Sequence, residues 1–252
     1  MAGVSDYGFD PSWDDEQRRL ALIERCYDPM TLRALADLGV AKGWHCADVG
    51  AGGGSISRWL RDTVGLEGRV VAIDLDTRFF EDESGIEAVR CDIMRDDLEA
   101  DAFDLVHCRL LLHHLRDKQV EAVQRLAGML KPGGVFVASE CYLGAMSASP
   151  NRAFADLWRG LYAAMPNADY EWAVALPATL QAAGLVKVEG TGAADLVRGG
   201  TDVAHFWRLT AQAVRARMPD DIDVDAGLAT LDDPATIEPS FVWYTAWGHR
   251  AP

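Results

Sequence analysis

Apolar residues recur along the chain in a rhythm that changes near residue 44. Between Glu16 and Leu38 they stand three or four positions apart, which is the spacing of one face of a helix. Pro29 interrupts this stretch. Because proline breaks the helical hydrogen-bond ladder, the pattern predicts one helix on each side of it. The polar residues 1–16, rich in Gly and Asp, are expected to form a loose arm.

From Trp44 onward, short apolar runs alternate with amphipathic stretches. This alternation favours a parallel sheet with right-handed crossover connections. The predicted strands are 44–49, 69–73, 87–90, 103–106, 135–140, 185–188 and 241–247, and the predicted helices are 55–64, 117–130, 150–165, 173–183, 202–217 and 223–231.

The densest run of glycines follows the first predicted strand. Asp48, Gly50, Gly52 and Gly54 form the pattern D-x-G-x-G-x-G directly before a predicted helix. Glycine allows a tight turn and a close approach of a ligand, and the start of a helix presents free N–H groups and a positive dipole end. The dinucleotide pattern G-x-G-x-x-G fails, because its third glycine would fall on Ser55. No Lys followed by Ser or Thr completes a phosphate loop, so ATP and GTP are also disfavoured.

The D-x-G-x-G-x-G pattern resembles the first motif of the class I S-adenosylmethionine (SAM)-dependent methyltransferases. The block Asp101–Asp117, which reads DAFDLVHCRLLLHHLRD, and the sequence Leu-Lys-Pro-Gly-Gly at 130–134 resemble later motifs of the same family. The resemblance covers residues 44–141 well and the remainder weakly, and it is greatest to the small-molecule branch that contains quinone and natural-product methyltransferases. It implies an α/β fold, a doubly wound, Rossmann-like sheet of seven strands, with the last strand antiparallel between the fifth and sixth.

The cofactor implied by this resemblance is SAM, with S-adenosylhomocysteine as the product. An acid at the end of the first strand suits the ammonium group of SAM. Asp74 ends the second strand 24 residues past Gly50, where an acid can hold both ribose hydroxyls, and Asp76 is the competing choice. The family further implies that Asp92 accepts a hydrogen bond from the adenine amino group and that Ile93 lines the ring. The complete expected set is Asp48, Gly50, Ala51, Gly52, Gly54, Asp74, Leu75, Asp92, Ile93, His107, Cys108 and Arg109.

The substrate is expected at the carboxyl ends of the strands, where ligands of open α/β sheets bind. The N-terminal helices and residues 141–172 are predicted to cover that edge. Their aromatic side chains suit an apolar or aromatic ligand, although each also suits a packed core. The expected substrate residues are Tyr27, Tyr142, Trp158, Tyr162 and Trp172.

Three residues near the same edge, His113, His114 and Glu140, are candidates for a catalytic base, and His205 is a fourth. The family often carries structural histidines at the positions of His113 and His114. A base is not required, because alignment of the acceptor with the reactive sulfonium can supply much of the rate.

Amino-acid composition and net charge disfavour some classes of binding partner. Apolar residues make up 49% of the 252, and 24 basic against 39 acidic residues give a net charge of −15. Such a charge repels nucleic acids and anionic lipids, so neither is an expected partner. The five cysteines form no C-x-x-C pair, which signals neither a disulfide framework nor a metal site. With no apolar run of 18 residues and no basic-then-apolar leader, a cytoplasmic protein is expected.

The sequence therefore predicts an N-terminal arm with lid helices at 1–40 and a SAM-binding domain at 41–252, with a helical insertion over the substrate at about 141–172. The predicted reaction is methyl transfer to an oxygen, nitrogen or activated carbon of a small metabolite. The alternative is a SAM-binding protein that performs non-methylating chemistry, such as cyclisation, or acts in regulation. An NAD-binding oxidoreductase is disfavoured by Ser55 and by the lack of a Tyr-x-x-x-Lys pair. A homodimer is possible. The sequence identifies neither the molecule that accepts the methyl group nor the atom that is methylated.

Overall fold

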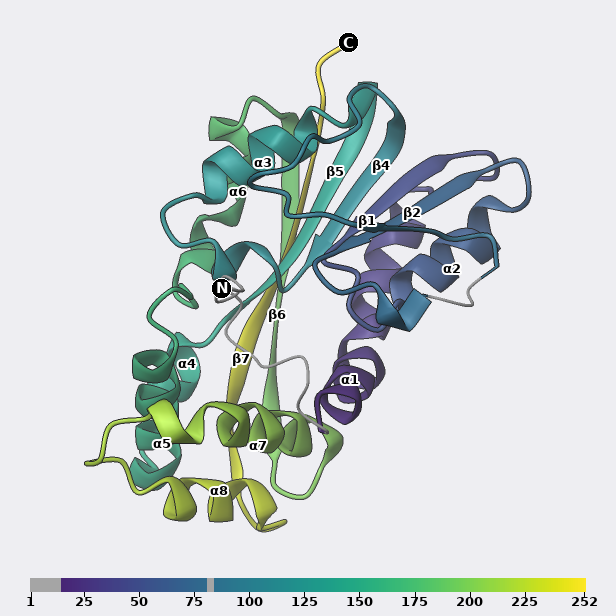
Figure 1. Ribbon diagram of the computed structural model, residues 1–252. Coiled ribbons are helices and arrows are strands. Elements are labelled where there is room, and N and C mark those ends of the chain that lie inside the picture. The colour runs from purple at the N-terminus through teal and green to yellow at the C-terminus, as the bar shows by residue number, and fades with distance from the viewer. Residues whose placement is uncertain (1–14, 81–83) are drawn as a thin grey trace, which may run out of the picture.

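The computed structural model, which describes residues 15–80 and 84–252, is built on one seven-stranded sheet (Figure 1). The strand order is β3-β2-β1-β4-β5-β7-β6, and β7 is antiparallel to both of its neighbours while the other pairs are parallel. This confirms the predicted α/β, doubly wound sheet, including the position of the last strand. The strands are β1 (His45–Val49), β2 (Arg69–Asp74), β3 (Glu87–Arg90), β4 (Phe103–Arg109), β5 (Leu130–Tyr142), β6 (Val186–Arg198) and β7 (Ile237–His249).

Helices connect the strands and cover both faces of the sheet. The α-helices are α1 (Glu16–Asp37), α2 (Ser55–Val64), α3 (Gln119–Ala127), α4 (Gly144–Ser147), α5 (Arg152–Ala164), α6 (Leu176–Ala182), α7 (Asp202–Val214) and α8 (Val224–Asp232). Short 3-10 turns are η1 (Arg78–Phe80), η2 (Leu112–His114), η3 (Trp172–Ala175) and η4 (Arg215–Arg217). None of the helices in the described part of the chain has the length and apolar character that a membrane span requires.

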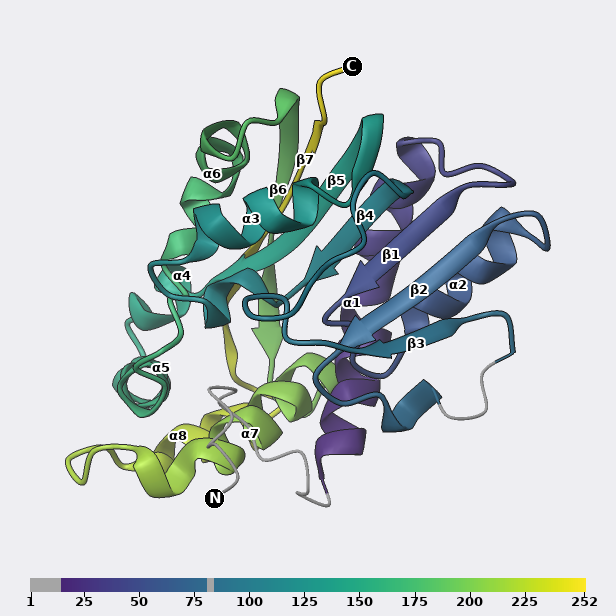
Figure 2. The same ribbon diagram turned by 45° about the horizontal axis from the view of Figure 1, so that its top comes forward.

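Three apolar clusters hold these layers together. Residues of α3 and α6 pack on one face of the sheet, and residues of α1 and α2, including Leu35 and Leu60, pack on the other. The third cluster joins α5, α7 and α8 to Phe241 and Trp243 of β7. Figure 2 shows α7 and α8 as a separate layer beyond the ends of the strands. Because parallel strands place their carboxyl ends at one edge, this layer and α1 surround the region where a ligand is expected.

The largest departure from the predicted elements is α1, which is one helix with Pro29 inside it. The prediction of two helices divided at Pro29 is wrong. A proline removes one ladder hydrogen bond, but Tyr27 before it and Thr31 after it are both buried. Packing on both sides therefore keeps the helix continuous through the proline. Of the predicted loose arm at 1–16, residues 1–14 lie outside the described residues. Its last residue, Glu16, is instead the buried first residue of α1 and pairs with Arg19 at 2.7 Å, so the prediction is wrong there.

A second departure is the segment Leu130–Gly134, which joins the predicted helix at 117–130 to the predicted strand at 135–140. Helix α3 ends at Ala127, and β5 already begins at Leu130, which pairs with Phe103 of β4. Gly133 has a φ of +82°, which glycine tolerates within this strand. Strand β5 is thus 13 residues long, and the residues between Leu130 and Val135 form an irregularity in its pairing with β4.

Candidate functional site

The glycine turn lies between β1 and α2, at the carboxyl edge of the sheet. Gly50, Gly52 and Gly54 have φ values of +68°, +55° and +83°, a region that other residues rarely adopt. A Cβ on Gly53 would collide with a carboxylate oxygen of Glu24, and a Cβ on Gly54 would come within 2.6 Å of the Phe80 ring. The backbone conformation therefore requires glycine at positions 50, 52 and 54, and the Phe80 ring adds to the requirement at Gly54, whereas the end of the Glu24 side chain could move away from a Cβ at position 53.

Asp48 lies beneath this turn in a buried network of three side chains. One carboxylate oxygen accepts a hydrogen bond from the Ser57 hydroxyl at 2.6 Å, and the other lies 2.8 Å from Nδ1 of His107. Burial alone would raise the pKa of Asp48, but the bonds from His107 and Ser57 outweigh burial and lower it below its ordinary value. Asp48 is thus held as a carboxylate by protein groups, and its expected contact with the SAM ammonium stays a prediction.

Asp74 and Asp76, the two candidates for the ribose, lie in different surroundings. The carboxylate of Asp74 accepts hydrogen bonds from the backbone N–H of Gly52 at 2.9 Å and of Asp76 at 3.0 Å, so it ties β2 to the glycine turn. Burial raises the pKa of Asp74. Asp76 instead pairs with Arg78 at 2.6 Å near the surface. Asp74 is thus the acid that contacts the glycine turn, and its expected contact with the ribose stays a prediction. Leu75 next to it exposes 47% of its surface.

Helix α1 contributes two acids to the turn that the sequence analysis did not single out as ligands. Asp28 accepts hydrogen bonds from the Ser55 hydroxyl at 3.0 Å and from Nη1 of Arg109 at 2.8 Å. Glu24 lies 3.6 Å from Arg58, and burial raises its pKa. On a helix with many charges, nothing in the sequence distinguishes these two acids from a solvated face.

The expected adenine residues follow β3. Asp92 is half-buried and accepts a hydrogen bond from the backbone N–H of Met94 at 3.0 Å, while Ile93 is buried in the apolar cluster of the sheet. His107 and Cys108 are buried at the end of β4, and Arg109 beside them is engaged by Asp28. Their contacts with a cofactor stay predictions.

The candidate bases meet where β4 and β5 end. Oε2 of Glu140 lies 2.6 Å from Nδ1 of His113, and Oε1 accepts hydrogen bonds from the backbone N–H groups of Leu111 and Leu112. His113 also packs against His114 and Tyr170, with ring centroids 4.0 and 4.8 Å apart. Burial, with lesser effects of His113 and Arg19, lowers the pKa of His114 well below its ordinary value. His205 lies apart from this group in sequence, on α7.

The expected substrate aromatics divide into two groups. Tyr27 and Trp158 are buried in the cluster formed by α5, α7, α8 and β7, and Tyr27 stacks on Trp243 with centroids 5.2 Å apart. Tyr142, Tyr162 and Trp172 are half-buried. The first two therefore contribute to packing, while the last three retain accessible surface for a ligand.

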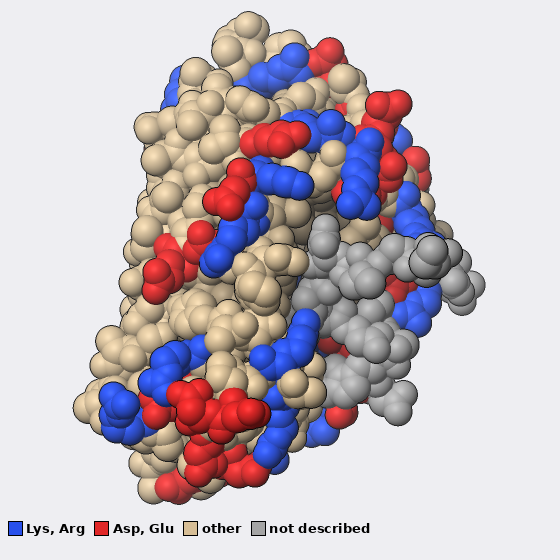
Figure 3. Space-filling model, turned by 60° about the vertical axis from the view of Figure 1, so that its left-hand side comes forward, with Lys and Arg blue, Asp and Glu red and all other residues tan. Residues whose placement is uncertain are grey.

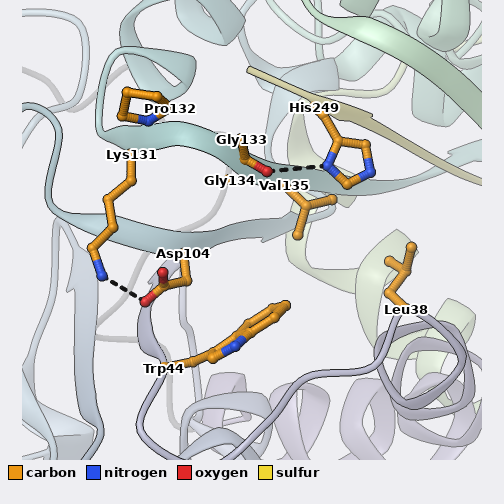
Figure 4. A pocket seen from close by; sticks show the side chains of 9 residues that line it. All are labelled: Leu38, Trp44, Asp104, Lys131, Pro132, Gly133, Gly134, Val135 and His249. Atoms are coloured by element: carbon orange, nitrogen blue, oxygen red, sulfur yellow. Dashed lines mark hydrogen bonds and ion pairs between the residues drawn. The ribbon is translucent and has the colours of Figure 1, made fainter. Parts of the chain in front are cut away.

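A hollow of about 480 Å³ lies at the opposite edge of the sheet (Figure 4). Residues at the amino ends of β1, β4 and β5 line it, among them Trp44, Asp104 and Lys131. Lys131 pairs with Asp104 at 2.7 Å, and Nδ1 of His249 lies 3.3 Å from the carbonyl oxygen of Gly133, so these polar groups already have partners. The hollow is remote from the glycine turn, and we assign it no role in catalysis.

Comparison with known proteins agrees with this geometry. Residues 47–138, which hold the glycine turn, Asp74, Asp92 and the end of β4, match the family model of a methyltransferase domain. Residues 47–138 are a methyltransferase domain of the class I SAM-dependent type. SAM is the cofactor of this domain, and methyl transfer is its chemistry. No curated protein matches the chain.

Solved structures share the fold of this methyltransferase domain at low sequence identity. The YcgJ protein from Bacillus subtilis has a TM-score of 0.58 at 15% identity, over 89% of this chain and 99% of that chain. The phosphoethanolamine N-methyltransferase 2 of Haemonchus contortus, in complex with SAM, has a TM-score of 0.64 at 16% identity, over 100% of this chain and 61% of that chain. A SAM-dependent methyltransferase from Aquifex aeolicus has a TM-score of 0.53 at 17% identity, over 94% of this chain and 98% of that chain.

Proposed function

We propose that the protein transfers the methyl group of SAM to an oxygen, nitrogen or activated carbon atom of a small, largely apolar metabolite. The observation that carries this proposal is the apolar layer of α5, α7 and α8 at the carboxyl edge, with half-buried Tyr142, Tyr162 and Trp172 nearby. An apolar lining with few polar groups is typical of a site for a small, ring-bearing ligand.

The cofactor would lie along the carboxyl ends of β1, β2 and β4. Asp74 would accept hydrogen bonds from the ribose hydroxyls, exposed Leu75 would pack on the adenine, and Asp92 with Ile93 would hold its far side. The carboxylates of Glu24 and Asp28 would favour the cationic methionine end, because they already lie against the glycine turn. When bound, SAM supplies an electrophilic methyl group on a sulfonium.

The residues around the methyl acceptor would act chiefly by position. Glu140 orients His113 and fixes the backbone of η2, so the wall beside the acceptor is rigid. His114 is neutral near pH 7 because its pKa is lowered, which leaves it free of positive charge. Aligning two bound ligands can itself lower the barrier by roughly 7–11 kcal/mol, so no side chain is assigned an indispensable proton transfer.

Surface charge supports a small metabolite over a nucleic acid. On the face drawn in Figure 3, basic side chains lie among acidic ones, and acidic side chains gather at the end of the molecule where α5 and α8 lie. The whole chain carries a net charge of −15. Because nucleic-acid affinity depends on neutralising phosphates, this surface suits such a partner poorly.

The experiment is a screen of phenols, quinones, indoles and amines with SAM, read as release of S-adenosylhomocysteine. Acceptor-dependent release with a product heavier by one methyl group is the expected result. Release of S-adenosylhomocysteine with no acceptor among these classes would contradict the proposed substrate class. A protein that binds SAM and converts ligands without releasing S-adenosylhomocysteine would instead support the non-methylating or regulatory alternative.

A further inference from the structure

Three polar groups in the apolar cluster of α5, α7, α8 and β7 form no hydrogen bond with any described residue. They are the hydroxyl of Tyr27 on α1, Nε1 of Trp158 on α5 and Nε1 of Trp207 on α7. All three residues are buried. The polar ends of tyrosine and tryptophan are usually paired when they are buried, because an unpaired buried donor destabilises the fold. Three such donors in one cluster therefore indicate a partner that is not part of the cluster itself.

The three donors lie close together. The rings of Trp158 and Trp207 have centroids 4.8 Å apart, and Phe241 contacts both Tyr27 and Trp207, with centroids at 5.2 and 5.6 Å. Burial raises the pKa of the Tyr27 hydroxyl well above its ordinary value, and the nearby indole N–H of Trp207 partly opposes this effect. The two groups are thus neighbours, although their geometry is not that of a hydrogen bond.

This group of donors adjoins the candidate site. Tyr27 directly precedes Asp28, which joins α1 to the glycine turn. The charge of Arg109, at the end of β4, also acts on the pKa of Tyr27. Cys141, which follows Glu140 in β5, belongs to the same apolar cluster as the three donors. A ligand at the carboxyl edge of the sheet would therefore lie next to them.

The hydrogen-bonding capacity of the group identifies the partner as an acceptor. An indole N–H can only donate, whereas a tyrosine hydroxyl donates one proton and can also accept one. Three protons are thus present for one acceptor oxygen. A carbonyl oxygen has two lone pairs and brings no proton, so it can accept from two of these donors at once. A hydroxyl group would instead add a fourth proton.

The surroundings favour a neutral acceptor over an anion. Tyr27 packs edge-on against the ring of Phe206, with centroids 5.7 Å apart. Two cations near the cluster, Arg19 and Arg109, are already paired with carboxylates of α1 at 2.7 and 2.8 Å. A carboxylate placed among these rings would lose its hydration without gaining a counter-ion, and burying such a charge costs more than burying a neutral carbonyl group.

Access to the donors requires a small movement of α1, because all three are covered. Helices α1 and α7 contact each other. Pro29 has no N–H to donate to the carbonyl oxygen of Arg25, so the turn of α1 that carries Tyr27 is held by one hydrogen bond fewer. Arg25 pairs with Asp202 of α7 at 3.0 Å, but both side chains are exposed, and exposed pairs contribute little. This part of the contact between α1 and α7 is therefore weakly held.

We propose that a neutral carbonyl oxygen of the methyl acceptor binds between the hydroxyl of Tyr27 and the indole N–H of Trp207. The acceptor is then a ring compound that carries a ketone, quinone or amide group in addition to the atom that is methylated. This inference rests on the proposed function, because it names the substrate class of that reaction. Tyr27 and Trp207 determine specificity and take no part in proton transfer.

The first experiment compares ring compounds that differ only in a carbonyl group. The probes are tetralone with tetralin and acetanilide with N-ethylaniline. Each is titrated calorimetrically into the protein saturated with S-adenosylhomocysteine, so that no methyl group is transferred. We expect the carbonyl compound of each pair to bind on the order of tenfold more tightly, because it gains two hydrogen bonds. Equal affinities within the pairs, or no measurable binding of the carbonyl compounds, would overturn the proposal.

The second experiment removes the donors one at a time. Tyr27→Phe and Trp207→Phe should each lower the preference for tetralone over tetralin by roughly threefold, because one hydrogen bond is lost and the ring remains. The matched control is Tyr244→Phe, which removes the hydroxyl of a half-buried tyrosine that packs against the cluster of α3 and α6. It should keep the full preference. A preference that is unchanged in both donor variants would contradict the assignment.

Thermal unfolding of the free protein separates a ligand from a buried water as the missing partner. A hydroxyl without a partner adds nothing to stability, so Tyr27→Phe should unfold at the same temperature as the wild type or at a higher one. A clear fall in the unfolding temperature would show that the hydroxyl is already paired, as it would be by an ordered water, and would overturn the proposal.

The inference and the proposed function can fail separately. If the acceptor screen finds that compounds without a carbonyl group are methylated as fast as their carbonyl analogues, the inference is wrong and methyl transfer stands. If carbonyl compounds bind through Tyr27 and Trp207 but no acceptor releases S-adenosylhomocysteine, the binding site stands and the proposed reaction is wrong.

Discussion

Oε2 of Glu140 lies 2.6 Å from Nδ1 of His113, while Oε1 of the same carboxylate accepts hydrogen bonds from the backbone of Leu111 and Leu112. One buried side chain from β5 therefore holds both the ring beside the proposed methyl acceptor and the turn that follows β4. Glu140 could therefore act in one of two ways. As a positioning residue it would only hold the geometry of the site, whereas as part of a catalytic base it would also help His113 to accept a proton from the substrate.

Glu140→Gln tests this distinction. The amide can still accept from the backbone through its oxygen, but it places a donor against Nδ1 of His113. We expect turnover to fall by less than the roughly 10²–10⁴-fold typical of losing a general acid–base group, with SAM binding unchanged in calorimetry. The single variants His113→Ala, His114→Ala and His205→Ala should likewise lower turnover by less than the loss of a general acid–base group would. A loss of more than about a thousandfold in any one of them, with fold and SAM binding intact, would identify that residue as part of a base.

Asp74→Ala should weaken SAM binding about tenfold to a hundredfold. Hydrogen bonds to a charged acceptor contribute roughly 1.5–3 kcal/mol, and the Asp74 carboxylate also holds the backbone of Gly52. The matched control is Asp76→Ala, which removes an acid that pairs with Arg78 near the surface. Calorimetric titration of both variants with SAM measures the difference. If the control weakens binding more than Asp74→Ala does, Asp76 is the ribose acid.

The sequence predicted the sheet well because its signals are local. The glycine turn, the acid that ends β2 and the apolar runs of β1 to β4 each depend on residues adjacent in the chain. The long strands β6 and β7 were predicted too short, at 185–188 and 241–247, because the small and polar residues of their outer parts lack an apolar period. The prediction that α1 would be divided at Pro29 failed for a related reason. Burial of Tyr27 and Thr31 depends on tertiary packing, which local propensity does not contain.

The site itself was predictable only where a motif marks it. Asp48 and Asp74 lie at the carboxyl edge as expected, and Glu140 and His113 lie together although 27 residues separate them. The partners Ser57 and His107 of Asp48 were not foreseen. Their approach requires the crossing of β1, β4 and α2, a tertiary arrangement that spacing along the chain does not reveal.

The Asp48 network makes a prediction about pH and stability. Because the pKa of Asp48 is lowered in the folded protein, its ionised form stabilises the fold at pH values above the unfolded pKa of about 3.8. This contribution should be lost as the pH falls through the lower, folded pKa. Asp48→Asn should reduce the free energy of unfolding by about 1.5–3 kcal/mol near pH 7. Denaturant unfolding from pH 3 to 7 should show the difference between wild type and variant shrinking only below about pH 4; a difference independent of pH would contradict the charged role.

Cofactor selectivity follows from the turn. With no phosphate-loop lysine and with carboxylates of Glu24 and Asp28 against the turn, SAM and S-adenosylhomocysteine should bind, and NADH and ATP should bind poorly. Anionic phosphates near these acids would be repelled, whereas the ammonium and sulfonium of SAM would be attracted. Calorimetry with all four ligands makes the comparison. Equal affinity for NADH would contradict the assignment of the cofactor.

The proposed lid role of α1 is tested best at Asp28. Deleting residues 1–30 would cut α1 in its middle and remove Leu22 and Tyr27 from the core, so loss of activity in that variant would report unfolding. Asp28→Ala leaves the helix in place but removes the acceptor shared by Ser55 and Arg109, which joins α1 to the glycine turn and to β4. We expect SAM to bind about tenfold more weakly, because one charged hydrogen-bond acceptor contributes roughly 1.5–3 kcal/mol and part of that loss is offset by water.

Asp37→Ala is the matched control, since Asp37 is an exposed acid on the same helix that lies 3.8 Å from Arg33. Calorimetry with SAM, together with thermal unfolding of both variants, separates binding from stability. Equal SAM affinity in the two variants would show that α1 serves only to cover the sheet.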